Sequence, residues 1–157
     1  RGQRFGVRYL VRLDLRKVIE GAAGGVLSGI GWTQLGIKIE KTRAELRTIL
    51  DTFKARNATI AVYGAPAKLT TLMYGLQLTA DDFDYVVDDA VEKQGRYTPG
   101  LHLPVLPPSA LVDTTRGGFP DAIFLGAWNF REPILKKLAP LMEGGVHVIV
   151  PFPLEVL

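Results

Sequence analysis

Runs of mostly apolar residues alternate along the chain with segments in which apolar residues recur at helical spacing. The runs cover residues 58–63, 83–88, 103–106, 121–126 and 146–150. Short runs of this kind, rich in β-branched and aromatic residues and flanked by turn-forming residues, predict buried strands. The segments 66–78 and 130–141 are predicted helices, and a brief helix is expected after Pro107 and Pro108.

Strands and helices that alternate in this way predict an α/β fold with helices on both faces of a parallel sheet. Connections between parallel strands are right-handed, so with the strands numbered along the chain the expected order is 3-2-1-4-5. This is a Rossmann-like, doubly wound parallel sheet. Its switch point lies between the strands at Ile60 and Ile123, where the loops 64–68 and 126–130 are expected to face each other.

A long amphipathic helix is predicted over residues 33–56, with Thr33 as its N-cap. Its apolar positions are spaced 4-3-4-3-4 and form one stripe: Leu35, Ile39, Thr42, Leu46, Ile49 and Phe53. The stripe either packs on the chain's own domain or pairs with a partner helix in a short coiled coil.

The N-terminal segment has two competing interpretations. Residues 5–15 alternate between apolar and polar positions, which predicts a half-buried strand, whereas Arg4, Arg8, Arg12 and Arg16 recur every fourth residue, as on a helix with a basic stripe. The glycine-rich stretch 21–31 is interpreted as a linker. We therefore divide the chain into an N-terminal strand and linker at 1–32 and a Rossmann-like domain at 33–157.

The turn after the first strand of the sheet is the first candidate binding site. Gly64 permits a tight turn and Pro66 suits the first position of a helix, whose free N–H groups and dipole attract anions. Lys68 adds a positive charge in that turn. A phosphate-bearing ligand is therefore expected there, the alternative being that Gly64 and Pro66 only mark a turn and Lys68 is a solvated lysine.

Three further segments supply candidate ligand contacts. The strand at 83–88 ends in Asp88, an acid that either accepts a hydrogen bond from a ribose hydroxyl or simply forms a turn. The loop 93–100 is rich in hydrogen-bonding groups. Trp128 offers a flat surface for a base or sugar unless it is a packing residue, and Asn129 either caps the next helix or bonds a ligand.

Composition narrows the function classes. At 157 residues and 47% hydrophobic content the chain can form one domain with a sizeable core. It contains no cysteine and two distant histidines, so no metal site is predicted. A net charge of +3 without interleaved aromatic and basic residues argues against nucleic-acid binding. No apolar run is long enough for a membrane span, and a cytoplasmic location is expected.

Several motifs in register resemble a known family. They are YGAPAK at 63–68, VVDD at 86–89, KQGRYTPG at 93–100, His102 with LPV at 103–105, AWNF at 127–130, and GGVHVIVPFP at 144–153. Together, over about residues 35–157, they resemble the C-terminal domain of the S-adenosylmethionine-dependent C-methyltransferases that act on nucleotide-linked deoxysugars. The resemblance implies that a small zinc domain and a central methyltransferase domain precede this one, and that residues 1–16 form the last strand of the central domain.

The same resemblance implies that this domain holds the nucleotide-diphosphate sugar, in partnership with the upstream methyltransferase domain. The implied substrate-binding residues are Tyr63, Gly64, Ala65, Pro66, Lys68, Asp88, Lys93, Gln94, Arg96, Tyr97, Trp128 and Asn129. The chain departs from the family pattern at Leu69, where glycine is usual, and at Ala90 and Val91, where Asn-Pro is usual.

The S-adenosylmethionine-binding glycine motif and the acid–base residues of the family are absent from this sequence, so no catalytic residue is predicted. The cofactor is expected to bind elsewhere in the full-length enzyme. The chain begins with Arg1 and is interpreted as a processed form or a piece of a longer protein. A stand-alone nucleotide-binding or regulatory module is the alternative. A nicotinamide oxidoreductase is disfavoured because the first turn is GAPAK rather than GxGxxG.

Overall fold

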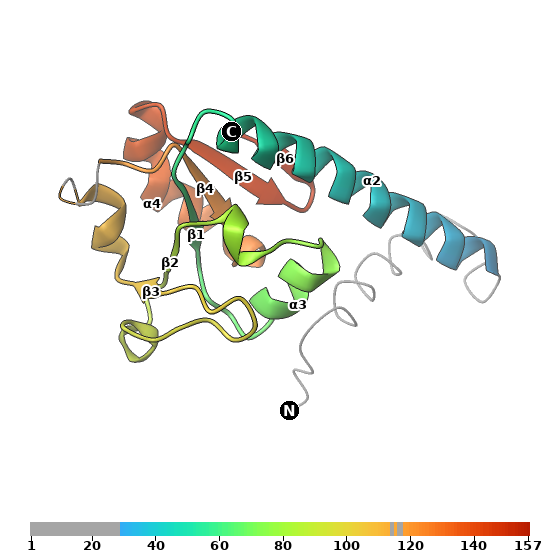
Figure 1. The fold of residues 1–157 in the computed structure, drawn as a ribbon, viewed down its shortest axis with the longest axis horizontal. Helices are drawn as coiled ribbons and strands as arrows, with labels where there is room; N and C mark the ends of the chain where they lie inside the picture. The colour runs from blue at the N-terminus through green and yellow to red at the C-terminus, as the bar shows by residue number, and fades with distance from the viewer. Residues whose placement is uncertain (1–28, 114, 116–117) are drawn as a thin grey trace.

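A single mixed sheet forms the centre of the structure, a computed structural model that describes residues 29–113, 115 and 118–157 (Figure 1). The sheet has six strands in the order β3-β2-β1-β4-β5-β6. Their bounds are β1 (Ile60–Tyr63), β2 (Tyr85–Val87), β3 (Val105–Leu106), β4 (Ala122–Leu125), β5 (His147–Pro151) and β6 (Leu154–Val156). The first five are parallel, which confirms the predicted order 3-2-1-4-5.

The strand β6 was not predicted. It pairs antiparallel to β5, with Pro151 opposite Leu154, so that Phe152 and Pro153 form a two-residue hairpin connection. Pro151 and Pro153 argue against a strand in this part of the sequence, but Pro151 is the last residue of β5 and Pro153 lies in the connection, so β6 itself contains no proline. Arg131 bonds Glu155 at 2.8 Å and so joins this edge strand to the helix that precedes β5.

Within the described residues, three α-helices accompany the sheet: α2 (Gly29–Lys54), α3 (Leu69–Gly75) and α4 (Arg131–Glu143). The connections β1–α3–β2 and β4–α4–β5 lead away from β1 and β4 in opposite directions, so right-handed crossovers place α3 and α4 on opposite faces of the sheet. Short 3₁₀ turns occupy much of the remaining chain: η1 (Ala80–Asp82), η2 (Val91–Lys93), η3 (Pro108–Val112) and η5 (Trp128–Phe130). The brief helix expected after Pro107 is η3.

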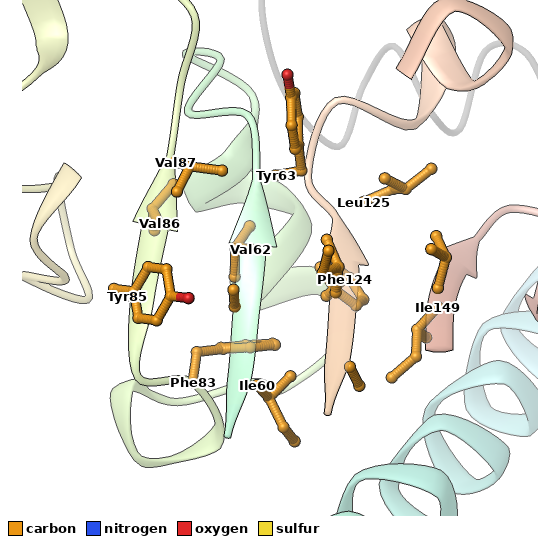
Figure 2. Packing of buried hydrophobic residues seen from close by; sticks show 14 of the residues in the cluster. Ile60, Val62, Tyr63, Phe83, Tyr85, Val86, Val87, Phe124, Leu125 and Ile149 are labelled. Carbon is orange, nitrogen blue, oxygen red and sulfur yellow. The ribbon is translucent and has the colours of Figure 1, made fainter. Parts of the chain in front are cut away.

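The core consists of side chains from adjacent strands. Figure 2 shows Ile60 and Val62 of β1 beside Phe124 of β4, with Ile149 of β5 beyond them, and each of these side chains is at most 1% exposed. Phe83 contacts Phe124 with ring centroids 5.3 Å apart. All residues of β1, β2 and β4 are buried, which is typical of central strands of a parallel sheet covered on both faces.

The helix α2 differs from its prediction at the N-terminus. It begins at Gly29, so Thr33 lies inside the helix rather than at its N-cap, and the predicted linker is wrong for residues 29–31. The predicted N-terminal strand at 5–15, and the rest of the linker, lie outside the described residues. The predicted stripe is confirmed at Leu46 and Phe53, which are buried with Leu50. Figure 1 shows the N-terminal half of α2 extending beyond the sheet, and Ile37 there is 62% exposed.

A buried carboxylate fixes α2 to the β1–β2 connection. The side chain of Asp82 is 1% exposed and accepts hydrogen bonds from Arg47 at 2.6 and 3.0 Å and from Lys54 at 3.3 Å. It also accepts from the N–H of Thr79 at 2.8 Å. Arg43 Nε donates to the carbonyl of Gly75 at 2.9 Å. Four polar side chains therefore hold the C-terminal half of the long helix in place.

The helix after β1 is shorter than predicted, because α3 covers seven residues instead of 66–78. The N–H of Leu69 bonds the carbonyl of Pro66 at 2.8 Å, so residues 66–68 form a turn before the helix. At the other end Gln77 has a φ of 55°, a left-handed conformation that ends the helix. Lys68 consequently occupies the N-cap of a short helix rather than its first turn.

Candidate functional site

A pocket opens at the carboxyl edge of the sheet, where β1 and β4 lie side by side and the chain leaves them in opposite directions. Its volume is about 320 Å³. The lining residues come from the ends of β1 and β2, from the loop after β4 and from α4: Tyr63, Gly64, Pro66, Asp88, Asp89, Lys93, Ala127, Phe130, Pro133, Ile134 and Lys137. This is the topological switch point, at which open α/β sheets bind their ligands.

The floor of the pocket is formed by two loops in very close contact. Gly64 has a φ of +92°, and a Cβ atom on it would lie 2.6 Å from the Cβ of Ala127. A Cβ on Gly126 would lie 2.5 Å from the carbonyl oxygen of Gly64. The N–H of Ala127 donates to the carbonyl of Tyr63 at 3.2 Å. Gly64 therefore makes room for the neighbouring loop, as well as for the turn that the sequence predicted.

Asp88 organises the loops on the β2 side of the pocket. One carboxylate oxygen accepts from the N–H of Ala65 at 2.6 Å and from Lys93 Nζ at 3.0 Å, and the other accepts from the N–H of Ala90 at 2.8 Å. Burial opposes ionisation, but these donors outweigh it and lower the pKa of Asp88. Its carbonyl accepts from Gln94 at 3.0 Å. Asp88 is thus ionised and only 7% exposed, and its oxygens already accept hydrogen bonds from the neighbouring loops.

Asp89 is more exposed and joins three elements around the pocket. One of its oxygens accepts from the hydroxyl of Tyr63 at 3.1 Å and from Lys137 Nζ at 2.8 Å. The Asp89 and Lys137 side chains are 54% and 55% exposed. Burial, followed by the bond to Asp89, raises the pKa of Tyr63, and the bond to Asp89 raises the pKa of Lys137. Figure 2 shows the phenol of Tyr63 projecting past the end of β1.

The opposite wall of the pocket is apolar. Phe130, Pro133 and Ile134 lie at the start of α4 and line the pocket together with Ala127. The side chain of Phe130 is 59% exposed. The pocket thus combines charged groups, three on the β2 side and Lys137 on α4, with the exposed aromatic ring of Phe130. This arrangement suits a small polar molecule that carries a ring.

Five of the predicted binding residues line this pocket: Tyr63, Gly64, Pro66, Asp88 and Lys93. Ala65 adjoins it, but its N–H group is bound to Asp88 and is not free for an anion. Similarly, the N–H of Gly64 donates to the carbonyl of Val87 at 2.7 Å. The turn after β1 therefore offers fewer free N–H groups than the sequence suggested.

Lys68 and Trp128 do not line the pocket but contact each other. The ammonium nitrogen of Lys68 lies 4.5 Å from the centroid of the Trp128 ring, and burial lowers the pKa of Lys68. Trp128 is only 9% exposed and also packs edge-on against Phe152 at 5.8 Å. Its ring thus serves mainly in packing. Asn129 is exposed and does not cap α4, whose N-cap is Phe130 without a side-chain bond.

The loop 93–100 is held by its own backbone and by Asp88. Gln94 bonds Asp88, and the backbones of Arg96 and Val105 join at 2.8 Å. Tyr97 stacks on His102 with centroids 5.2 Å apart, and Tyr97 is 61% exposed. The side chains of Arg96 and Tyr97 therefore face solvent rather than the pocket, whereas Lys93 and Gln94 lie beside Asp88.

Six pocket residues were missed as site candidates: Asp89, Ala127, Phe130, Pro133, Ile134 and Lys137. Asp89 directly follows the chosen Asp88, and sequence gives no means of telling which of two adjacent acids is buried. A usable signal existed on α4, because positions 130, 133, 134 and 137 fall on one helical face that starts at the switch-point loop.

The described residues include no group of three or more histidine, aspartate and glutamate side chains that could hold a metal ion. None of the helices they form is long and apolar enough to cross a membrane.

Comparison with known proteins agrees with this architecture. Residues 20–153 match the family described as "C-methyltransferase C-terminal domain". The chain is 30% identical over 129 residues to "C-methyltransferase NovU" of Streptomyces niveus, an alignment that covers 82% of this chain and 30% of that protein. The chain therefore spans less than a third of the length of the curated relative that it matches. On these grounds the chain belongs to the C-methyltransferase C-terminal domain family.

Proposed function

We propose that this domain holds a nucleotide-linked deoxysugar for an S-adenosylmethionine-dependent C-methyltransferase. The observation that carries the proposal is the pocket at the switch point, which combines Tyr63, Asp89 and Lys137 with the exposed ring of Phe130. Charged groups on one wall suit the hydroxyls of a sugar, and the aromatic wall suits a base or a sugar ring. Methyl transfer itself is assigned to residues outside this chain, in the upstream methyltransferase domain.

The diphosphate of the ligand is assigned to Lys68. Among the described residues at this edge, Lys93 and Lys137 are each paired with an aspartate, whereas Lys68 contacts the ring of Trp128. Its charge is therefore not neutralised by a carboxylate. Lys68 follows the pocket residue Pro66 by two positions, so a ligand that fills the pocket can extend toward it. Partial burial of the ammonium group strengthens its attraction for an anion.

We propose that the turn after β1 does not bind S-adenosylmethionine. A glycine motif in that turn normally leaves space for a cofactor to approach the backbone. Here the sequence of the turn is GAPAK, without that motif, and Ala127 closes the side of Gly64 to which a Cβ would point, at 2.6 Å. We therefore assign the methyl donor to another part of the full-length enzyme.

Isothermal titration calorimetry of the chain with UDP-glucose and dTDP-glucose tests the proposal. Lys68→Ala and Lys68→Met should each weaken binding by roughly 10- to 100-fold, because a charge-assisted hydrogen bond contributes about 1.5–3 kcal/mol. Lys38→Met removes an exposed lysine on α2 and should leave binding unchanged. The methionine variant keeps the aliphatic stem and separates charge from packing on Trp128.

A parent chain that binds neither nucleotide sugar would contradict the proposed function. Parent-like affinity in both Lys68 variants would leave the function standing and move the diphosphate site elsewhere. A nucleotide-binding module without catalysis would bind the same ligands, so binding alone does not distinguish it from the domain of a methyltransferase. Methyl transfer by the full-length protein, lost when Lys68→Ala is introduced there, supports the methyltransferase.

A further inference from the structure

The charged groups of the pocket are balanced. Asp88 and Lys93 form one ion pair at 3.0 Å, and Asp89 and Lys137 form another at 2.8 Å. All four side chains line the same pocket. Two positive and two negative charges leave no net charge to attract a phosphate, and each ammonium group already has a carboxylate beside it. A phosphate placed here would also be repelled by two ionised aspartates at short range.

The two pairs differ in what they leave available for a ligand. Both oxygens of Asp88 accept hydrogen bonds from backbone N–H groups, and the side chain is buried. In Asp89, Oδ2 accepts both bonds described above, from Tyr63 and Lys137, and among the described residues Oδ1 has no hydrogen-bond donor. Lys137 uses one of its three N–H bonds on Asp89. The second pair thus presents one strong acceptor and at least one strong donor, both half-exposed at the pocket.

Lys137 Nζ contacts the Asp89 carboxylate at 2.8 Å through Oδ2, so the free oxygen Oδ1 of the same carboxylate and the remaining N–H bonds of Lys137 lie side by side. Such a neighbouring acceptor and donor match two hydroxyl groups on adjacent carbons. One hydroxyl donates to the free oxygen of Asp89, and the second accepts from Lys137. Tyr63 holds the carboxylate in position by donating to its other oxygen, and burial raises the pKa of this phenol, which keeps it protonated as the donor. Hydrogen bonds to charged groups are stronger than those between neutral groups, so this arrangement recognises a diol firmly.

We propose that Asp89 and Lys137 bind a vicinal diol of the ligand, and that this pocket takes sugar hydroxyls rather than phosphates. The inference rests on the proposed function, which it deepens by dividing the ligand between two places: hydroxyls at Asp89 and Lys137, and diphosphate near Lys68. The diol belongs either to the ribose of the nucleotide or to the transferred hexose, and the choice of ligands in the experiment separates these.

The decisive variant is Asp89→Asn, because it changes the charge of the pocket from balanced to positive. A diol site loses its ionised acceptor, so binding of UDP-glucose should weaken at least tenfold. A phosphate site would gain attraction, so binding would strengthen. Calorimetry of the 157-residue chain with UDP-glucose, UDP and inorganic pyrophosphate measures whether the substitution weakens or strengthens the binding of each ligand. A loss with UDP as well as UDP-glucose assigns the diol to ribose, and a loss with UDP-glucose alone assigns it to the hexose.

Matched variants control for folding and for general charge effects. Lys137→Met should weaken UDP-glucose binding at least tenfold, whereas Lys136→Met, its exposed neighbour on α4, should not. Asp81→Asn removes an exposed acid from η1 and should also leave binding unchanged. Pyrophosphate binding should stay within threefold of the parent, or tighten, in Asp89→Asn. A thermal melt of each variant identifies any that fail to fold. Asp89→Glu keeps the carboxylate at this position and should retain more affinity for UDP-glucose than Asp89→Asn.

The outcomes separate the inference from the proposed function. Equal or tighter UDP-glucose binding by folded Asp89→Asn, or unchanged binding by Lys137→Met, would overturn the diol site while leaving nucleotide-sugar binding intact. A parent chain that binds no nucleotide sugar would overturn both together.

Discussion

Replacing the buried carboxylate of Asp82 should loosen α2 from the sheet and lower the free energy of unfolding. Burial alone would raise the pKa of Asp82, but the bonds from Arg47, Thr79 and Lys54 lower it from 3.8 to about 2. A pKa difference of this size corresponds to about 2 kcal/mol of stability. Asp82→Asn keeps the shape and an acceptor for the N–H of Thr79, so the loss should be close to this ionic contribution.

The difference in the free energy of unfolding between the parent and Asp82→Asn should depend on pH. Since the folded pKa of Asp82 is depressed, its contribution is fully present above the unfolded value of 3.8 and is lost as the pH falls through about 2. The difference between parent and Asp82→Asn should be about 2 kcal/mol at pH 7 and should shrink to about 1 kcal/mol at pH 2.5.

Urea unfolding followed by circular dichroism at pH 7, 4, 3 and 2.5 measures both quantities. Asp81→Asn, an exposed neighbour on the same turn, is the control and should change the free energy of unfolding by less than about 0.5 kcal/mol. If Asp82→Asn is as stable as the control at pH 7, or if its deficit is the same at pH 7 and 2.5, then the ionised carboxylate does not stabilise the contact between α2 and the β1–β2 connection.

Two further predictions concern the pocket floor and the methyl donor. Gly126→Ala should destabilise the fold by about 1–3 kcal/mol in urea unfolding, because its Cβ would lie 2.5 Å from the carbonyl oxygen of Gly64, and a variant as stable as the parent would contradict this close packing. Gly95→Ala, where a Cβ meets open space at a φ of +76°, should cost about 1 kcal/mol from backbone strain, a contribution that is absent at Gly126 because its φ is not positive. Calorimetry of the chain with S-adenosylmethionine should show no binding, since the turn at residues 64–68 lacks the glycine motif of such a site; micromolar affinity would refute that assignment.

The sequence determined the five parallel strands of the sheet but not the antiparallel edge strand β6. Short apolar runs, glycine turns and intervening helical segments are local properties, and the right-handed crossover rule converts their order into the strand order 3-2-1-4-5. The same strand order places the switch point at the loops that begin with Gly64 and Gly126. The apolar stripe at Leu46 and Phe53 gave the buried face of α2, because helical spacing alone sets which residues share a face.

Only the tertiary structure decided which polar side chains form the site. Tyr63 and Asp89 are 26 residues apart, and Asp89 and Lys137 are 48 apart, so their pairing depends on how β1, β2 and α4 meet. Asp88 and Asp89 are adjacent and chemically identical, yet the backbone donors of Ala65 and Ala90 take up the first and leave the second facing the pocket. The surroundings of Lys68 likewise depended on the tertiary structure, because Lys68 lies at the N-cap of α3 rather than in its first turn and its ammonium group lies over the ring of Trp128. Local pattern fixes which elements form, whereas the partner of a charged side chain is set by distances between elements that no local pattern contains.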